Sequence, residues 1–478
     1  MYIELNSERR VRGVLVALLA GVLVFNATLV AAGGGGEESD TDTAIDSGAD
    51  SAGSGLIGPR GERFPVAPEV PDGPLSQQNR QALDQIRVAI ETGELEAPMI
   101  LQLSDAEDPR VLWYLSDLLR FIGSAGARVI YDVVLDMTGV ALHNQSSAAL
   151  RNHLFAWDLP AYPEYREDKR SLYLLIEPGW EPFFADADSA IDWRYVEWGG
   201  VLIDDRIDGS PGVPCFRCIP ALDDAPVTDA DGGDWYPDDG LIFGVVINGQ
   251  ARAYPRNMME VHEMVNDTLG GRRFGMPYCT LCLSAQAYYT DNVDGFSPVL
   301  RTSGLLARSN KFMYDISTMS AVDTFTGRAI SGPLFDAGVQ LEMISVVTST
   351  WGEWKRAHPA TTILTEDGGV PGRAYQADPL RGRDDNGPIF PVGAVDPRLP
   401  VQERVLGVID SDGTPVAFPV VTTAIALQQG DRVSFGDIMV TLDGSGLRAT
   451  VDGEDPGSHE AFWFAWSQFR PDTVIWER

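Results

Sequence analysis

The sequence predicts an α+β protein, with an N-terminal helical domain followed by two related, mostly antiparallel, β-rich modules. Apolar residues recur at three- and four-residue spacing over residues 76–155, as in amphipathic helices. From residue 199 onward, β-branched runs bounded by Gly, Asp, Asn and Pro indicate strands and turns. Two short patterns within this second region recur in the same order nearer the C-terminus, which indicates a duplication. A chain of 478 residues has room for two to four such domains.

The N-terminal segment carries a targeting or anchoring signal. Arg9, Arg10 and Arg12 precede an uncharged run at 13–36, which is about the length that spans a bilayer and is long for the core of a signal peptide. We therefore expect residues 1–32 to be a signal peptide or a membrane anchor and the protein to be extracytoplasmic, either membrane-anchored or secreted. Contact with a membrane is expected through this segment alone. Residues 33–75 are rich in Gly, Ser, Asp and Pro, which predicts a disordered acidic tether.

A mainly helical domain is predicted over residues 76–198. Leu83, Ile86 and Ile90 fall on one face of its first helix, and a second helix follows Pro109. Nine aromatic residues between 160 and 200 are expected to pack this domain onto the part that follows. An unknown protein partner could bind through the helical domain.

The β-rich part is predicted from its hairpins. The run 241–255 contains Asn248-Gly249, a pair that supplies the positive φ angles of a two-residue turn. Its pattern at 244–255 is echoed at 407–419, and the pattern at 354–364 is echoed at 466–475. These echoes divide the region into three parts. Residues 199–366 form a first β-rich module with a His/Cys site, and residues 367–387 form a linker rich in Gly, Pro and Arg. Residues 388–478 form a second β-rich module that is a possible repeat.

The charge of the chain excludes some classes of partner. The net charge is −33, and only three of the 36 basic residues are lysines, Lys169, Lys311 and Lys355. No basic stripe is present to neutralise phosphates, so nucleic-acid binding is excluded. A surface so acidic is typical of a halophilic-type protein, because salt screens its self-repulsion.

The four cysteines form two Cys-x-x-Cys pairs, Cys215 with Cys218 and Cys279 with Cys282. Two such loops can hold one metal ion between four thiolates. Either pair can instead be a redox dithiol, or a structural disulfide in an oxidising compartment. If a cofactor is present we expect a metal ion, zinc more than copper, because the nearby methionines more often fill core gaps than ligate Cu(I).

His262 is the residue that most resembles a catalytic or metal-ligating group. A helix predicted over 259–269, with Gly270-Gly271 as its stop, places Asn266 one turn along on the same face. His262 could ligate a metal or act as a general acid or base, with Glu263 or Asp267 orienting its ring. The alternative is a core histidine bonded to a backbone carbonyl.

Polar residues in the run 300–333 could line a pocket. Arg308, Asn310 and Tyr314 alternate there with apolar positions, and we expect them, with Asn266, to bind a cofactor or ligand. They could equally cap turns. No serine stands in the context of a nucleophile elbow, so a hydrolase is the weaker reading, and the residues do not decide whether the protein is an enzyme.

Three segments resemble the family called domain of unknown function 3179: AYPRNMMEVHEMVNDTLGGRRFGMPYCTLC, SGLLARSNKFMYD and TWGEWKRAHPATTIL. The activity of that family is not established, and many of its members look exported. The resemblance marks six residues as signature positions, and it implies a two-cysteine site with the first Cys pair as a local addition or disulfide. The six are His262, Glu263, Asn266, Asp267, Cys279 and Cys282.

Two functions follow as hypotheses. In the first, an exported or membrane-anchored protein uses Cys279, Cys282 and His262 for metal binding or thiol redox chemistry, with Cys215 and Cys218 as further metal ligands in a four-cysteine site. In the second, the protein is a non-catalytic extracytoplasmic binding or scaffold module whose cysteines are all in structural disulfides.

Overall fold

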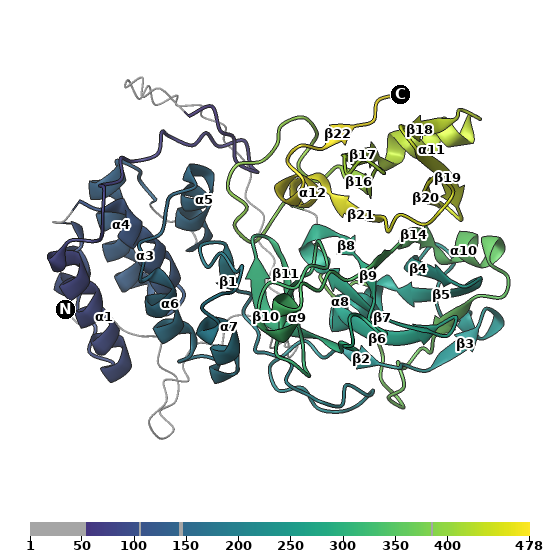
Figure 1. Ribbon diagram of the computed structural model, residues 1–478, viewed down its shortest axis with the longest axis horizontal. Coiled ribbons are helices and arrows are strands. Elements are labelled where there is room, and N and C mark those ends of the chain that lie inside the picture. The colour runs from purple at the N-terminus through teal and green to yellow at the C-terminus, as the bar shows by residue number, and fades with distance from the viewer. Residues whose placement is uncertain (1–53, 105–106, 143–146, 384–385) are drawn as a thin grey trace, which may run out of the picture.

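The computed structural model describes residues 54–104, 107–142, 147–383 and 386–478 (Figure 1). The predicted signal or anchor at 1–32, and the tether up to residue 53, lie outside this part of the chain. Within the described ranges, no helix is both long enough and apolar enough to cross a membrane. The remaining tether residues, 54–75, pack against the helices, because Phe64 is buried and the Trp157 indole N–H donates to the Pro65 carbonyl at 2.9 Å.

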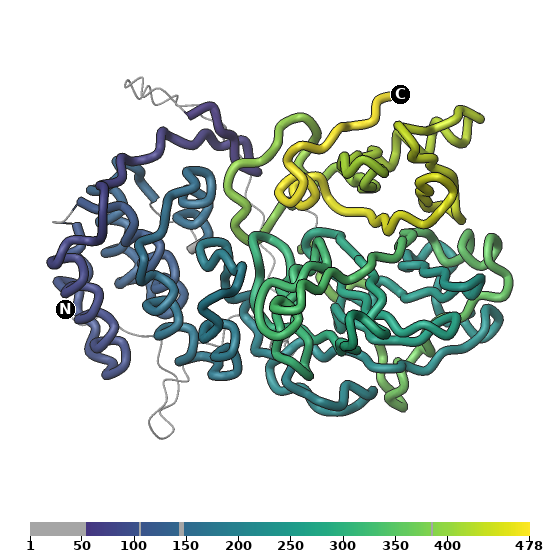
Figure 2. The backbone as a smooth tube through the Cα atoms, in the orientation of Figure 1, coloured from purple at the N-terminus to yellow at the C-terminus, as the bar shows by residue number. Residues whose placement is uncertain are grey.

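The first seven α-helices of the described residues gather at the N-terminal end of the molecule and form one layer beside the sheets (Figures 1 and 2). Helix α1 begins where the Ser76 hydroxyl accepts from the Asn79 N–H, and it ends at Gly93 in the left-handed conformation. The helices are α1 (Gln77–Thr92), α2 (Ala97–Leu101), α3 (Leu112–Leu118), α4 (Ser124–Thr138), α5 (Ser147–Trp157), α6 (Tyr165–Tyr173) and α7 (Glu181–Ala185).

A buried charge cluster joins these helices to the first strand, β1 (Val196–Trp198). Asp117 on α3 accepts from Arg151 at 2.5 Å, from Lys169 at 3.1 Å and from the Tyr165 hydroxyl at 2.7 Å. The Lys169 ammonium also donates to the Val196 carbonyl at 2.5 Å. Every donor in this cluster has a partner. A charged group that is buried away from solvent requires such pairing and hydrogen bonding.

The fold class predicted from the sequence is wrong in its β part, because the strands of the described residues form five small, mainly antiparallel sheets rather than two modules. The first sheet, β1-β10-β11-β12, packs against the helical layer, and the indole N–H of Trp180 donates to the Ser303 carbonyl of β10 at 2.7 Å. Its other strands are β10 (Leu300–Ala307), β11 (Asn310–Asp315) and β12 (Ala321–Asp323).

Two larger sheets follow, with strand orders β13-β9-β7-β6-β2 and β14-β4-β5-β15-β3. The first contains β2 (Leu222–Asp223), β6 (Met264–Leu269), β7 (Arg272–Cys279), β9 (Ala287–Tyr289) and β13 (Met343–Ile344), and β8 (Ser284–Ala285) pairs with β7. The second contains β3 (Val227–Asp229), β4 (Leu241–Ile247), β5 (Gln250–Pro255), β14 (Val347–Thr350) and β15 (Thr362–Leu364). Helix α8 (Arg256–His262) follows β5, α9 (Gly332–Asp336) lies between β12 and β13, and α10 (Trp351–Ala357) lies between β14 and β15.

The C-terminal part supplies the last two sheets, β21-β16-β17-β22 and β18-β19-β20, shown in yellow-green to yellow in Figure 1. Their elements are β16 (Arg404–Ile409), β17 (Pro415–Pro419), α11 (Val420–Gln428), β18 (Val433–Phe435), β19 (Ile438–Asp443), β20 (Gly446–Val451), β21 (His459–Phe462), α12 (Trp463–Phe469) and β22 (Val474–Ile475).

The echoed sequences occupy matching places in two of the five sheets. The β4–β5 hairpin pairs antiparallel with β14 and parallel with β15, and the β16–β17 hairpin pairs in the same way with β21 and β22. A helix beginning with Trp follows β14 and β21 alike. In each sheet a second tryptophan packs over a strand glycine, Trp354 over Gly244 and Trp466 over Gly407.

Candidate functional site

The stretch around His262 is not the single helix that its spacing predicts. Helix α8 ends at His262, because Glu263 adopts a left-handed conformation at φ 53° and its N–H closes the last turn on the Met259 carbonyl at 2.8 Å. The chain then continues as strand β6. Asn266 therefore lies on a strand, and not one helical turn beyond His262.

The second cysteine pair is a free, buried dithiol at the end of β7. Cys279 ends the strand, a 3₁₀ turn carries Thr280–Cys282, and Leu283 reverses the chain at φ 50°. The two thiols lie near the Ser309 carbonyl, with Cys282 Sγ at 3.2 Å and Cys279 Sγ at 3.7 Å. Cys279 is 5 % exposed and Cys282 is fully buried.

The surroundings of the pair make its two thiols unequal. A hydrogen bond from Cys282 lowers the pKa of Cys279, against the opposing effect of burial. The nearby Lys311 ammonium lowers the pKa of Cys279 further, whereas the Glu263 carboxylate opposes it. Burial raises the pKa of Cys282 well above its ordinary value. Cys279 is therefore the better thiolate of the pair.

A buried ion pair lies beside the dithiol. The Lys311 ammonium donates to a Glu263 carboxylate oxygen at 2.5 Å and to the Glu263 carbonyl at 3.1 Å. Thr280, between the two cysteines, donates to the other carboxylate oxygen at 3.4 Å. Glu263, a residue predicted to be catalytic, thus contacts the Cys-x-x-Cys turn and Lys311.

The C-terminal part of the chain covers the dithiol. Phe464 and Ala465 of α12, together with Val392, form one apolar cluster with the two cysteines. The Gln468 amide donates to the Ser309 hydroxyl at 3.3 Å, which ties α12 to the residue whose carbonyl the thiols approach.

His262 lies in a different environment from the thiols. Its Nδ1–H donates to the Pro220 carbonyl at 2.7 Å, so Nε2 carries the lone pair and accepts from the Tyr375 hydroxyl at 2.8 Å. Burial lowers the pKa of His262 to about 4, so the ring is neutral near neutral pH. The predicted set of His262 with Cys279 and Cys282 is not brought together as a group of metal ligands among the described residues.

Asn266 and Asp267 hold the sheets together. Asp267 accepts from Arg252 and from the Tyr254 hydroxyl, each at 2.7 Å. The Asn266 amide donates to Asp223 at 2.9 Å, and its oxygen accepts from the Leu300 N–H at 3.0 Å. These bonds join neighbouring strands and leave neither side chain directed at the thiols.

The residues predicted to line a pocket on β10 and β11 do not converge on one. Arg308 lies over the Tyr195 ring at 3.9 Å, and the Tyr314 hydroxyl donates to the Asp204 carbonyl at 2.7 Å. Asn310 caps the next backbone N–H, that of Lys311, at 2.7 Å. The alternative reading, in which such residues cap turns, describes Asn310.

The first cysteine pair is a disulfide, Cys215–Cys218, in the loop that joins β1 to β2. Asp204 lies beside it, and the three possible ligand atoms are all within 4.8 Å of one another. Both oxygens of the Asp204 carboxylate already accept from Arg206, at 2.6 and 2.7 Å. A metal ion would fit this group only with the disulfide reduced and the Arg206 contacts rearranged.

Sequence reasoning missed Lys311, Ser309 and Tyr375. Lys311 had a usable signal, since it is one of three lysines in a chain with 69 acidic residues. Ser309 acts mainly through its carbonyl, which no side-chain pattern reveals. Tyr375 lies 113 residues after His262 in the predicted linker, so only the fold brings them together.

The fold and the site define a β-rich protein with a buried Cys-x-x-Cys pair at the end of a strand. Residues 217–452 match the model of the family described as protein of unknown function DUF3179. This match confirms the resemblance stated from the motifs of the chain. No curated protein and no solved structure gives a match.

Proposed function

We propose that the protein carries out thiol–disulfide exchange with Cys279 and Cys282 as its working pair. The observation that carries this proposal is that the two thiols are adjacent, free and unequal, with the pKa of Cys279 lowered and that of Cys282 raised. Thiol–disulfide exchange by a dithiol needs this difference in pKa, because one cysteine must attack as a thiolate while the other cysteine stays protonated as a thiol.

The exchange balances in atoms and electrons when a disulfide of a partner molecule is the oxidant. The Cys279 thiolate attacks one sulfur of that disulfide, so a mixed disulfide forms and the other partner sulfur leaves as a thiolate that takes up a proton. Cys282 then loses its proton and attacks Cys279, which releases the second partner thiolate. Two electrons pass from the pair to the partner, and Cys279–Cys282 becomes a disulfide.

The Lys311–Glu263 pair is the group that would accept and return the Cys282 proton. Glu263 lies within reach of the turn through Thr280, and Lys311 compensates its charge while the carboxylate is ionised. We propose Glu263 as the proton acceptor and Lys311 as the residue that positions and neutralises its carboxylate.

An extracytoplasmic location, anchored or secreted, is part of the same proposal. The Cys215–Cys218 disulfide supports it, because such bonds persist in oxidising compartments. An exported protein also meets disulfides in other exported proteins, and the helical layer offers a surface for such a protein partner.

Trapping of the mixed disulfide tests the exchange. With Cys282→Ser the attack by Cys279 is retained and its resolution is lost, so a covalent adduct with a model disulfide such as oxidised glutathione should accumulate, as measured by intact mass. Cys279→Ser is the matched control and should form none. Equal labelling of both variants, or of neither, would contradict the assignment of Cys279 as the attacking thiol.

A metal site at Asp204, Cys215 and Cys218 is the second candidate. It rests on the closeness of the three ligand atoms. Two thiolates and a carboxylate, with no methionine or histidine in the group, favour zinc over copper. Elemental analysis of the reduced protein should then find one zinc that Cys215→Ser abolishes, whereas zinc that survives this substitution would refute the site.

A further inference from the structure

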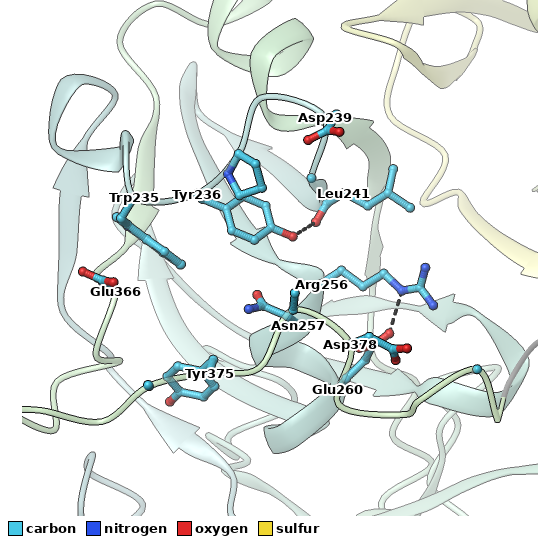
Figure 3. Close-up of a pocket in the computed structure, with 15 residues that line it drawn as sticks. Trp235, Tyr236, Asp239, Leu241, Arg256, Asn257, Glu260, Glu366, Tyr375 and Asp378 are labelled. Carbon is cyan, nitrogen blue, oxygen red and sulfur yellow. Dashed lines mark hydrogen bonds and ion pairs between the residues drawn. The ribbon is translucent and has the colours of Figure 1, made fainter. Parts of the chain in front are cut away.

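A cavity of about 600 Å³ opens beside α8, and Figure 3 shows the residues that line it. Its walls come from the loop 235–241, from Arg256, Asn257 and Glu260 on α8, and from the segment 374–382. Its volume suits a small organic ligand. None of its lining residues is used by the proposed thiol chemistry.

The cavity is acidic. Asp239, Glu366 and Asp378 line it, and among the described residues none of these three forms an ion pair. The lining guanidinium, Arg256, is already neutralised by Glu260, with Nε and Oε1 2.7 Å apart (Figure 3). The cavity therefore presents an excess of negative charge to whatever enters it.

The aromatic rings of the lining are fixed before any ligand binds. The Tyr236 hydroxyl donates to the Leu241 carbonyl at 2.7 Å, and the Tyr375 hydroxyl donates to His262. Trp235 packs against Tyr236 with ring centroids 5.3 Å apart. Rings held beside carboxylates attract a cation and cover the methylene groups of an aliphatic chain.

Asn257 adds an independent sign of a ligand. It is 6 % exposed, its amide donates to the Gln376 carbonyl at 3.2 Å, and its Oδ1 is buried without a partner among the described residues. In Figure 3 the side chain lies between Trp235 and Tyr375, within the cavity lining. A buried oxygen acceptor without a donor is uncommon in folded proteins, and an ammonium group would supply the donor.

We propose that this cavity binds a small aliphatic amine in its ammonium form. The ammonium group donates to Asn257 Oδ1 and is balanced by the acidic rim. The alkyl chain lies against Trp235 and Tyr375.

Calorimetric titration of the full chain at constant ionic strength tests the proposal, with cadaverine as the probe and pentanediol as its neutral counterpart of equal chain length. Cadaverine should bind at least tenfold more tightly than pentanediol. Glu366→Gln alters an exposed carboxylate that forms no ion pair among the described residues, so it should leave the fold intact and weaken cadaverine binding severalfold. Tyr375→Leu should weaken it more than Tyr375→Phe, which keeps the ring.

Two controls separate a built site from general attraction to an acidic surface. Asp336→Asn removes one exposed carboxylate of α9, outside the cavity, and should leave binding unchanged. Equal binding of pentanediol, or an equal effect of Asp336→Asn and Glu366→Gln, would overturn the proposal. Because these variants leave the cysteines unchanged, failure here is distinguishable from failure of the thiol chemistry.

Discussion

At the residue scale, the pKa of Cys279 depends on charges that only the fold brings near it. Sequence reasoning found the two cysteines and Glu263 from their motif and composition. It joined His262 to them because the four lie close in sequence, whereas α8 ends at His262 and the chain turns away. The backbone angle of Glu263 decides this, and glutamate at a positive φ angle is too rare to expect from sequence.

Lys311→Met should raise the pKa of Cys279, because it removes a cation that lowers that pKa and leaves the Glu263 carboxylate unopposed. Alkylation of the reduced pair near neutral pH should then slow severalfold, as followed by the pH dependence of the iodoacetamide rate. Lys311→Arg keeps the charge and should stay close to the natural protein. An unchanged rate profile for Lys311→Met would show that Lys311 does not act on the thiol.

His262 should lower the free energy of unfolding of the protein in acid. Its pKa in the folded protein is about 4, below the ordinary value of 6.5, so the unfolded chain takes up the proton first. The stability from this group is complete above about pH 6.5 and is lost as the pH falls towards 4, at up to ~1.4 kcal/mol per pH unit. Urea unfolding of the natural protein and of His262→Asn should show a steeper pH dependence for the natural protein, and parallel curves would contradict this.

At the element scale, the echoed hairpins were visible in the sequence because Asn-Gly turns and Trp spacing are local signals. The number of sheets was not visible in the sequence, because strands that pair or pack together, such as β2 and β6 or β8 and β21, are separated by long connections. Periodicity gives strands but does not say which strands pair, so the division into two modules was wrong while the hairpins within it are present.

The glycines beneath the two tryptophans should not tolerate a methyl group. A Cβ at Gly407 would meet the Trp466 ring, and one at Gly244 would meet the Trp354 ring, each closer than van der Waals contact. Gly407→Ala and Gly244→Ala should each destabilise the fold by about 1–3 kcal/mol through overpacking, as measured by urea unfolding. Gly413→Ala faces open space and should cost only the smaller strain of its left-handed angle, ~1 kcal/mol.

The charge cluster should be the main polar anchor of the helical layer. Asp117→Asn removes the charge that compensates Arg151 and Lys169, both buried, and should lower the free energy of unfolding by about 3–5 kcal/mol. Asp132→Asn changes an exposed residue of α4 and should have little effect. If both variants unfold at the same urea concentration as the natural protein, the cluster does not hold the layer.

At the scale of the whole molecule, the C-terminal sheets lie over the dithiol, so the site needs the entire β part. Composition predicted the acidic character of the chain, and the motif predicted the family, but neither could place α12 above the Cys279–Cys282 turn. Packing between segments nearly two hundred residues apart decides that arrangement. In the proposed exchange a partner disulfide would meet Cys279, which is 5 % exposed, and not Cys282, which is fully buried.

A redox titration of the full chain tests the central claim most directly. The protein is equilibrated in glutathione buffers of graded potential, and its cysteines are alkylated and mapped by mass spectrometry. The account predicts that Cys279 and Cys282 convert together, as one two-electron step, between two thiols and a disulfide while the protein stays folded. Two thiols that remain reduced at every potential, or that convert only after unfolding, would contradict it.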